Sequence, residues 1–318
     1  MTKTVIYSMI GYKKKMERSM IFLDQFSLPS HAVEDRLLNA QYHMSQAGYT
    51  DNAYPCNLFV QKQLHSLDFK DVTILYGGNG SGKSTLLNLI TKKLTLKRVS
   101  PFNSSNIFDA FTKECDYRMA FDEEGDYFRV PNGSRIITSD DVFDYMLNVR
   151  VNNKDIVDNV MATRERHEEL VFKKTVKMRG MQDYEDLRDQ VIARKMSGRQ
   201  YVYKENGKEV RLNSNGETAL RFFYEKLKDD TLFLLDEPEN SLSPKFQIEL
   251  ADMIKDMARY SGCQFIIATH SPFMLAIDGA KIYDLDEVPV NVKKWWQLEN
   301  PRIYFEFFDK HRELFKEE

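Results

Sequence analysis

Three short apolar runs stand out along the chain because each ends in polar residues. Val72–Tyr76 precedes a glycine-rich stretch, Thr231–Leu235 precedes two carboxylates, and Gln264–Ala268 precedes Thr269 and His270. Nearly continuous apolar runs of this length are typical of strands buried on both faces of a parallel sheet. The pattern predicts an α/β fold whose mainly parallel sheet is flanked by helices, with the polar strand ends at one edge.

Apolar residues recur at helical spacing after two of these runs. One helix follows the glycine-rich stretch and contains Leu86, Leu87, Ile90 and Leu94. The other begins at Ser243-Pro244, where Ser serves as N-cap and Pro as the first helical residue, and ends at Gly262. The alternation of buried strands and amphipathic helices predicts a single layered domain over residues 1–318.

Between these halves the sequence becomes long, charged and helical. It predicts helices over 141–149, 153–178 and 182–196, which together form a helical insertion at 139–200. Between Arg164 and Arg211 there are thirteen Lys and Arg against nine Asp and Glu. This excess fits a solvated helical face, and it also fits a surface for nucleic acid or a partner protein.

The remaining segments predict smaller elements. A strand over 19–26, a helix over 34–47 and a hairpin with strands 117–121 and 127–130 precede the insertion. Residues 289–318 predict a C-terminal helical extension, with a helix that starts at Pro301. Its aromatic residues fit core packing or the docking of a partner chain.

Composition narrows the class of protein. The chain has 318 residues, 42% hydrophobic residues and a net charge of −3, so a packed globular core is expected and no global attraction to nucleic acid is evident. The three cysteines, Cys56, Cys115 and Cys263, lie far apart without a C-x-x-C pair, which argues against a zinc site or a disulfide framework. No signal-like or membrane-spanning run is present, so a cytoplasmic protein is expected.

The glycine-rich stretch has the form G-x-x-x-x-G-K-[ST] between a strand and a helix, which is typical of a phosphate-binding loop. Its backbone N–H groups and the following helix N-terminus favour an anion. We expect Lys83 to reach the β- and γ-phosphates of ATP and the Ser84 hydroxyl to hold Mg²⁺. The expected nucleotide-binding set is Gly77, Asn79, Gly80, Ser81, Gly82, Lys83, Ser84 and Thr85.

The polar ends of the other two strands supply the remaining expected chemistry. Asp236 is expected to orient Mg²⁺ and its water, and Glu237 to polarise the attacking water. His270 lies where an imidazole can hydrogen-bond a γ-phosphate. Glu237, His270 and Lys83 are therefore the expected catalytic residues, and Ser84 and Asp236 the expected metal ligands.

The order of these motifs resembles the ATP-binding-cassette (ABC) class of P-loop ATPases. It is similar in particular to the SMC/RecF/OLD-like branch and its small bacterial AAA family ATPase members. The resemblance rests on the phosphate loop, Asn213–Glu217, Leu235–Pro238, Glu239–Ser243 and His270. It implies an antiparallel β subdomain beside the parallel sheet.

The resemblance also implies an ATP-dependent homodimer. Asn213–Glu217 would be the signature loop, in which Ser214 supplies a hydroxyl, Gly216 an N–H and Glu217 the start of a helix, all to ATP held by a second subunit. Residues 240–243 would cross the dimer interface. The motif has Asn213 where Leu is usual and Asn215 where Gly is commoner, and no glutamine loop is evident, so Ser139–Asp141 is its candidate substitute.

Two questions stay open from the sequence. Tyr54 or Phe59 could stack on adenine, or both could be core residues. The ATPase could drive a DNA-linked or phage-defence type process with a partner effector. Alternatively, the chain could be the nucleotide-binding subunit of an ABC transporter, or a nucleotide-gated binding module with little turnover.

Overall fold

The computed structural model describes residues 18–45, 53–102, 104–122, 124–173, 184–198, 200–201, 204 and 215–316. The chain divides into two compact units. The first comprises Met1–Val142 with Ala219–Glu318, and the second comprises Phe143–Thr218. Both sheets belong to the first unit.

The main sheet of the first unit has six strands in the order β5-β6-β7-β3-β8-β9. Five are parallel: β3 (Val72–Tyr76), β5 (Arg135–Thr138), β6 (Leu232–Asp236), β7 (Gln264–Ala268) and β8 (Lys281–Asp284). The short edge strand β9 (Asn291–Lys293) pairs antiparallel with β8. Every residue of β3 and β7 is buried, as the apolar runs predict. The mainly parallel α/β sheet is thus confirmed.

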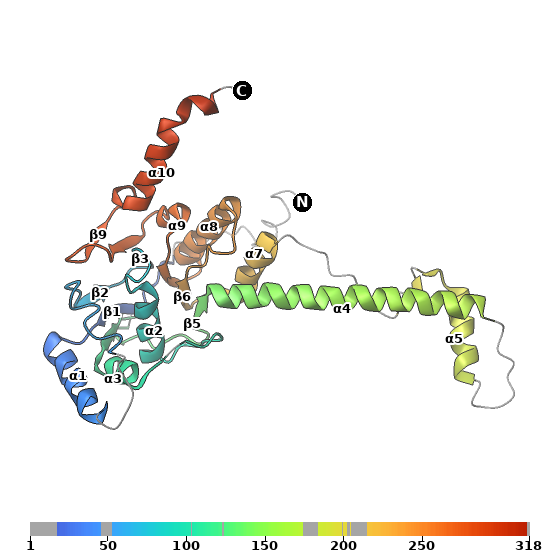
Figure 1. Cartoon of the computed structure of the whole chain (residues 1–318), viewed down its shortest axis with the longest axis horizontal. Coiled ribbons are helices and arrows are strands. Elements are labelled where there is room, and N and C mark those ends of the chain that lie inside the picture. Colours follow the sequence, from blue (N-terminus) through green and yellow to red (C-terminus); the bar gives the residue numbers. More distant parts are fainter. Residues whose placement is uncertain are drawn as a thin grey trace. The chain divides into compact units, whose positions relative to one another are not determined.

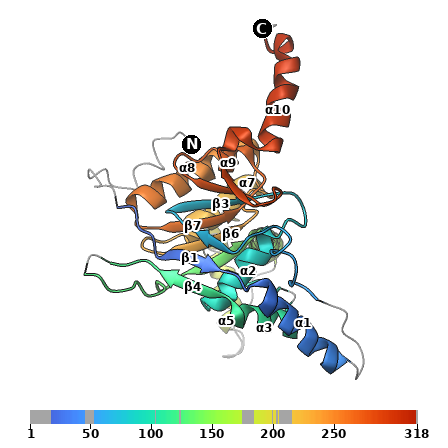
Figure 2. The same cartoon turned by 90° about the vertical axis from the view of Figure 1, so that its left-hand side faces the viewer.

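Helices cover both faces of this sheet. Helix α2 (Lys83–Lys93) follows β3 and buries Leu86, Leu87 and Ile90, and α8 (Pro244–Tyr260) connects β6 to β7 and buries Leu250 and Ile254. Figures 1 and 2 show α2 and α8 on opposite faces. This follows from right-handed crossovers, because the chain moves across the sheet in opposite directions after β3 and after β6.

A separate three-stranded antiparallel sheet has the order β2-β1-β4, from β1 (Leu23–Ser27), β2 (Ser66–Asp68) and β4 (Asp116–Met119). Beside it pack α1 (His31–Ser45) and α3 (Asn106–Glu114), which lie next to each other in Figure 2. The side chain of Gln264 in β7 joins the two sheets. Fully buried, it accepts from Phe22 N and Leu23 N, both at 2.9 Å, and donates to Leu23 O at 2.8 Å and Lys70 O at 3.1 Å.

Several sequence expectations need correction. Helix α3 follows the loop at residues 100–105, where the sequence predicted strands directly after the loop. It has a strong cap, since Phe108 N donates to the Ser105 hydroxyl at 3.2 Å. The predicted hairpin turn is present, with Asp122 N bonded to Asp126 O at 2.8 Å. Its second arm, however, forms only the bridge Phe121–Tyr127 and not the strand predicted over 127–130.

The described residues of the second unit are mainly helical. Helix α4 (Ser139–Phe172) runs without a break where the sequence predicted two helices, and it starts in the first unit. Helix α5 (Tyr184–Lys195) matches the third predicted helix closely. Within this unit His167 Nε2 lies 3.0 Å from Ala193 O, and Arg166 pairs with Asp189 at 3.2 Å. The unit also contains the start of α7 (Asn215–Lys226).

The short helix α9 (Pro272–Leu275) lies between β7 and β8. The described part of the C-terminal extension consists of β9, the short helices η2 (Trp295–Gln297) and η3 (Arg312–Phe315), and α10 (Glu299–Lys310). Helix α10 extends away from the main sheet in Figures 1 and 2. All its residues are described, and Pro301 alone is buried. The core-packing interpretation of its aromatic residues is therefore wrong, since Phe307 is 59% and Phe308 53% exposed.

Candidate functional site

The carboxyl ends of the five parallel strands meet at one edge of the main sheet, and the predicted polar side chains lie there. The glycine-rich loop follows β3 and leads directly into α2. Gly82 has φ +103°, and a Cβ atom at this position would lie 3.0 Å from a ring carbon of Phe59. The loop can therefore take this path against the core only with glycine at position 82.

Ser81 is a second feature of the loop that suits an anion. Its hydroxyl oxygen is buried, and no described residue forms a hydrogen bond with it. A buried hydroxyl without a partner is costly unless it has a ligand, because its hydrogen bonds to water have been lost. The loop therefore provides a polar group suited to a phosphate oxygen.

Lys83 is buried, and its ammonium group makes three contacts within the loop and with β7. Its Nζ donates to Gly77 O at 2.8 Å and to Gly78 O at 3.1 Å, and it lies 2.8 Å from His270 Nε2. Because a lysine ammonium can only donate, the lone pair of His270 Nε2 accepts in this contact. Burial lowers the pKa of Lys83, against the nearby charges of Glu237, Asp236, Asp286 and Glu239.

Ser84 and Asp236 form the expected metal-binding pair. The Ser84 hydroxyl donates to Asp236 Oδ1 at 2.9 Å. The pKa of Asp236 is raised to about 6, mainly because burial disfavours the charged carboxylate. The charge of Glu237 also raises this pKa, while Ser84, Lys83 and Arg98 lower it. A half-buried carboxylate and a hydroxyl oxygen are hard ligands of the kind that Mg²⁺ takes together with water and phosphate oxygens. The residues therefore fit Mg²⁺.

Glu237 lies directly after β6 in an unusual backbone conformation. Its φ is +49°, in the left-handed region, and its N–H donates to Ala268 O at 2.9 Å. Non-glycine residues are uncommon there and concentrate at functional sites. Its carboxylate accepts from Asn240 Nδ2 at 2.8 Å and lies 3.4 Å from His270 Nε2. Since Nε2 accepts from Lys83, the approach of Glu237 is a close contact and not a hydrogen bond.

Glu239 holds His270 in place, a role that the sequence did not reveal. Its Oε1 accepts from Thr269 Oγ1 at 2.5 Å, His270 N at 2.8 Å and Ser271 N at 3.1 Å. The buried carboxylate thereby fixes the β7 strand end to the loop after β6. Its motif position, two residues after Glu237, is the one signal that could have indicated this.

Asp286 is a second site residue that the sequence analysis missed. It follows β8 at the same sheet edge, and its Oδ2 accepts from Gly78 N at 2.6 Å. No motif marks it, because the contact joins positions 208 residues apart. Only the pairing of β3 with β8 brings it to the loop.

The open question on Tyr54 and Phe59 is settled in part. Phe59 is fully buried and belongs to the core. Tyr54 is 41% exposed, its hydroxyl lies 2.5 Å from Thr85 Oγ1, and its ring stacks on Phe108 at 6.1 Å. Tyr54 is thus the aromatic available beside the loop.

Asp141, in the segment suggested as a glutamine-loop substitute, is already bonded to protein groups. Its carboxylate accepts from Thr138 N at 2.9 Å, Ser100 N at 3.0 Å and Ser100 Oγ at 2.5 Å. These bonds secure the start of α4. Within the suggested segment, Asp140 is exposed.

The chain resembles one family over almost half its length. Residues 129–276 match the family described as "AAA domain, putative AbiEii toxin, Type IV TA system". The match is consistent with an ABC-type AAA family ATPase. It includes Asp236, Glu237 and His270 and lies entirely C-terminal to the phosphate loop. No curated protein matches the chain.

Solved structures of SMC head domains and of an ATP-binding cassette show a distant likeness to this chain. The Smc head domain of Pyrococcus furiosus, bound to the C-terminal domain of ScpA, is 13% identical with a TM-score of 0.35, covering 78% of this chain and 95% of that one. The SMC head domain of Thermotoga maritima is 16% identical with a TM-score of 0.33, covering 72% and 92%. The ATP-binding cassette MJ0796, a dimer bound to ADP and Pi, is 16% identical with a TM-score of 0.34, covering 72% and 88%.

Two of the expected signature residues, Gly216 and Glu217, belong to the second unit. Gly216 and Glu217 are in the first turn of α7, as a helix starting after the signature predicts. Asn213 and Ser214 lie outside the described residues. Among the helices of the described part, none is long and apolar enough to cross a membrane.

Proposed function

We propose that the chain is an Mg²⁺-dependent ATPase that closes as a homodimer around ATP. The supporting observation is the convergence, at one sheet edge, of Lys83, the Ser84–Asp236 pair, Glu237 and His270, from segments as far as 187 residues apart. A triphosphate needs this combination of cation, metal ligand, base and hydrogen-bonding imidazole.

Each residue has a distinct role in the proposed reaction. Lys83 binds the β- and γ-phosphates, exchanging its contacts with the loop carbonyls for phosphate oxygens. Ser84 and Asp236 would hold Mg²⁺, which neutralises phosphate charge when bound. Glu237 accepts a hydrogen bond from the attacking water and orients it. Once Lys83 has moved to the phosphates, His270 Nε2 carries a proton and donates a hydrogen bond to the γ-phosphate. Most of the rate gain comes from positioning and from electrostatic stabilisation.

The second subunit would complete the pocket with its signature loop. Ser214, Gly216 and Glu217 supply a hydroxyl, an N–H and a helix N-terminus, and such groups stabilise an anion. The binding of the γ-phosphate by both chains would favour the closed dimer, and hydrolysis would reopen it.

For the process that this cycle drives, we propose a phage-defence or DNA-linked role with a partner effector. The family description names a toxin of a toxin–antitoxin system, which supports defence. The exposed aromatic side chains of α10 support a partner protein. The cytoplasm is the proposed compartment.

The decisive experiment uses Glu237→Gln, with Glu124→Gln in the exposed hairpin turn as the matched control. We expect the Glu237 variant to bind Mg-ATP within threefold of wild type, to lose at least about 100-fold in turnover, and to form a dimer by light scattering. Wild-type turnover in this variant would refute the role of Glu237. ATP binding without turnover in the wild type, with or without duplex DNA, would favour a nucleotide-gated module, and co-purification with a permease would favour a transporter subunit.

A further inference from the structure

Asp286 follows β8 and His270 follows β7, and these strands flank β3, so the two residues lie on opposite sides of the phosphate loop in strand order. The Asp286 carboxylate packs over the first two glycines of the loop: a Cβ atom on Gly77 would lie 3.2 Å from Asp286 Oδ1, and one on Gly78 would lie 3.6 Å from Oδ2. The 2.6 Å bond from Gly78 N to Oδ2 is charge-assisted and therefore among the stronger classes of hydrogen bond.

Asp286 is itself held in place by the β8–β9 hairpin. Its backbone N donates to Asp284 Oδ1 at 3.1 Å, and Asp284 is buried. Lys293 of β9 pairs with Asp284 at 3.0 Å and with Glu287 at 3.1 Å, and these hydrogen bonds raise the pKa of Lys293. Neighbours on two strands therefore help to position Asp286 beside the loop.

A second hydrogen bond ties the end of β3 to the C-terminal helix α10. Tyr76, which directly precedes Gly77, accepts at its hydroxyl from Asn300 N at 3.1 Å. Asn300 is in the first turn of α10, where backbone N–H groups have no partner within the helix. Tyr76 O also accepts from Leu285 N at 2.8 Å. The end of β3, residues 285–286 and the start of α10 therefore form one hydrogen-bonded unit.

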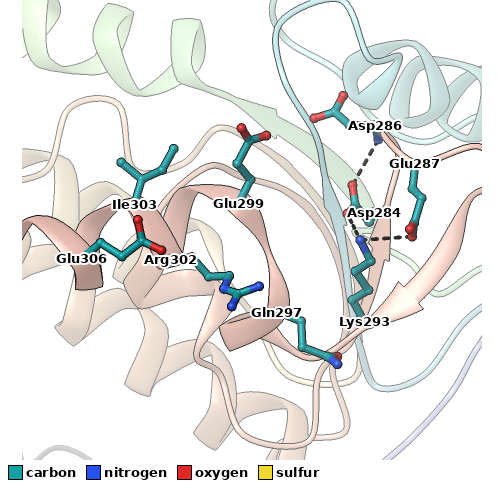
Figure 3. A pocket seen from close by; sticks show the side chains of 9 residues that line it. All are labelled: Asp284, Asp286, Glu287, Lys293, Gln297, Glu299, Arg302, Ile303 and Glu306. Atoms are coloured by element: carbon teal, nitrogen blue, oxygen red, sulfur yellow. Dashed lines mark hydrogen bonds and ion pairs between the residues drawn. The ribbon is translucent and has the colours of Figure 1, made fainter.

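Between these elements lies an open hollow of about 630 Å³. Figure 3 shows Asp284, Asp286, Glu287 and Lys293 gathered on one side and residues of α10 on the other, namely Glu299, Arg302, Ile303 and Glu306. Five carboxylates against two cations make this hollow negative, so it is unsuited to a triphosphate. Asp286, which bonds the phosphate loop, and residues of α10 thus line the same hollow.

We propose that Asp286 is a positioning residue of the phosphate loop and that, with Tyr76, it couples the loop to helix α10. The coupling is local and physical. A phosphate that shifts Gly77 and Gly78 must shift the carboxylate bonded to Gly78 or break that bond, and Asp286 adjoins the segment bonded to Tyr76. The coupling adds a regulatory connection to the proposed ATP site. The tests with ATP rest on the proposed function, whereas the positioning of the loop by Asp286 does not.

The first test compares Asp286→Ala, which removes the acceptor, with Asp286→Asn, which retains one. We expect the Ala variant to bind ATP about tenfold more weakly than the Asn variant, because only the Asn variant keeps a side-chain acceptor for Gly78 N that orders the loop. Without nucleotide, amide hydrogen exchange in residues 76–82 should rise in the Ala variant and stay near wild type in the Asn variant. Equal exchange in both variants would overturn the positioning role.

The second test addresses the connection to α10 and uses Tyr76→Phe, which loses only a hydroxyl. In the wild type, ATP should change the exchange of residues 299–310, and the change should be at least halved in the Tyr76 variant. An unchanged response would overturn the coupling. If the wild type binds no ATP, the proposed function fails, whereas the nucleotide-free exchange of the Asp286 variants still decides the positioning role.

Discussion

Asp236 offers a prediction in which function and stability oppose each other. Burial raises its pKa from 3.8 to about 6, so the folded state keeps a proton that the unfolded state loses at lower pH. Below about pH 4 both states are protonated and the residue has no effect on stability through its charge. As the pH rises through 4 to 6 the folded state loses stability relative to the unfolded state.

The size of this loss follows from the shift. The pKa values of the folded and unfolded states differ by roughly two units, and each unit corresponds to about 1.4 kcal/mol. Above pH 6 the ionised Asp236 therefore lowers the free energy of unfolding by about 3 kcal/mol. Asp236→Asn removes the charge, and its amide oxygen can still accept from the Ser84 hydroxyl. We expect this variant, free of nucleotide and metal, to be more stable by about 2 to 3 kcal/mol at pH 7.5 and equal to wild type near pH 4.

Urea unfolding in EDTA at several pH values measures this difference, with Asp256→Asn on the exposed side of α8 as the matched control. The Asn variant should also lose most of the stabilisation that Mg-ATP gives the wild type, because a metal ligand is missing. A variant that is less stable than wild type at neutral pH, or whose advantage does not change with pH, would refute the reasoning.

Two further predictions concern buried side chains that organise the site. Gln264→Leu leaves the N–H of Leu23 and three other backbone groups without this partner. We expect the free energy of unfolding in urea to fall by about 3 to 5 kcal/mol. Gln61→Leu at an exposed position should change it by less than about 0.5 kcal/mol. Glu239→Leu removes the acceptor that positions His270, so turnover should fall at least tenfold more than ATP affinity, while Glu239→Gln, which keeps an oxygen acceptor, should stay within about threefold of wild type. Equal kinetics in the two Glu239 variants would contradict the positioning role of that carboxylate.

The sequence by itself determined the elements that depend on local pattern. Buried strands have uninterrupted apolar residues, so the sequence alone predicted the positions of β3, β6 and β7 closely. The loop before α2 was equally predictable, because the spacing of its Gly, Lys and Ser residues is typical of a loop whose backbone surrounds a phosphate. Parallel strands place their carboxyl ends at one edge, and this rule was enough to predict that Lys83, Asp236 and His270 would lie together.

Tertiary structure alone decided the features that depend on contacts between distant segments. Asp286 has no sequence pattern of its own, and the motif that contains Glu239 does not show which groups its carboxylate bonds. Both roles arise from strand pairing that brings a carboxylate to a backbone N–H. Likewise, the aromatic spacing of α10 is the same whether the helix is buried or exposed, since periodicity shows which residues share a face and not what covers that face. Burial and long-range hydrogen bonds depend on which distant segments meet in the folded chain, and a local sequence pattern does not show which segments meet.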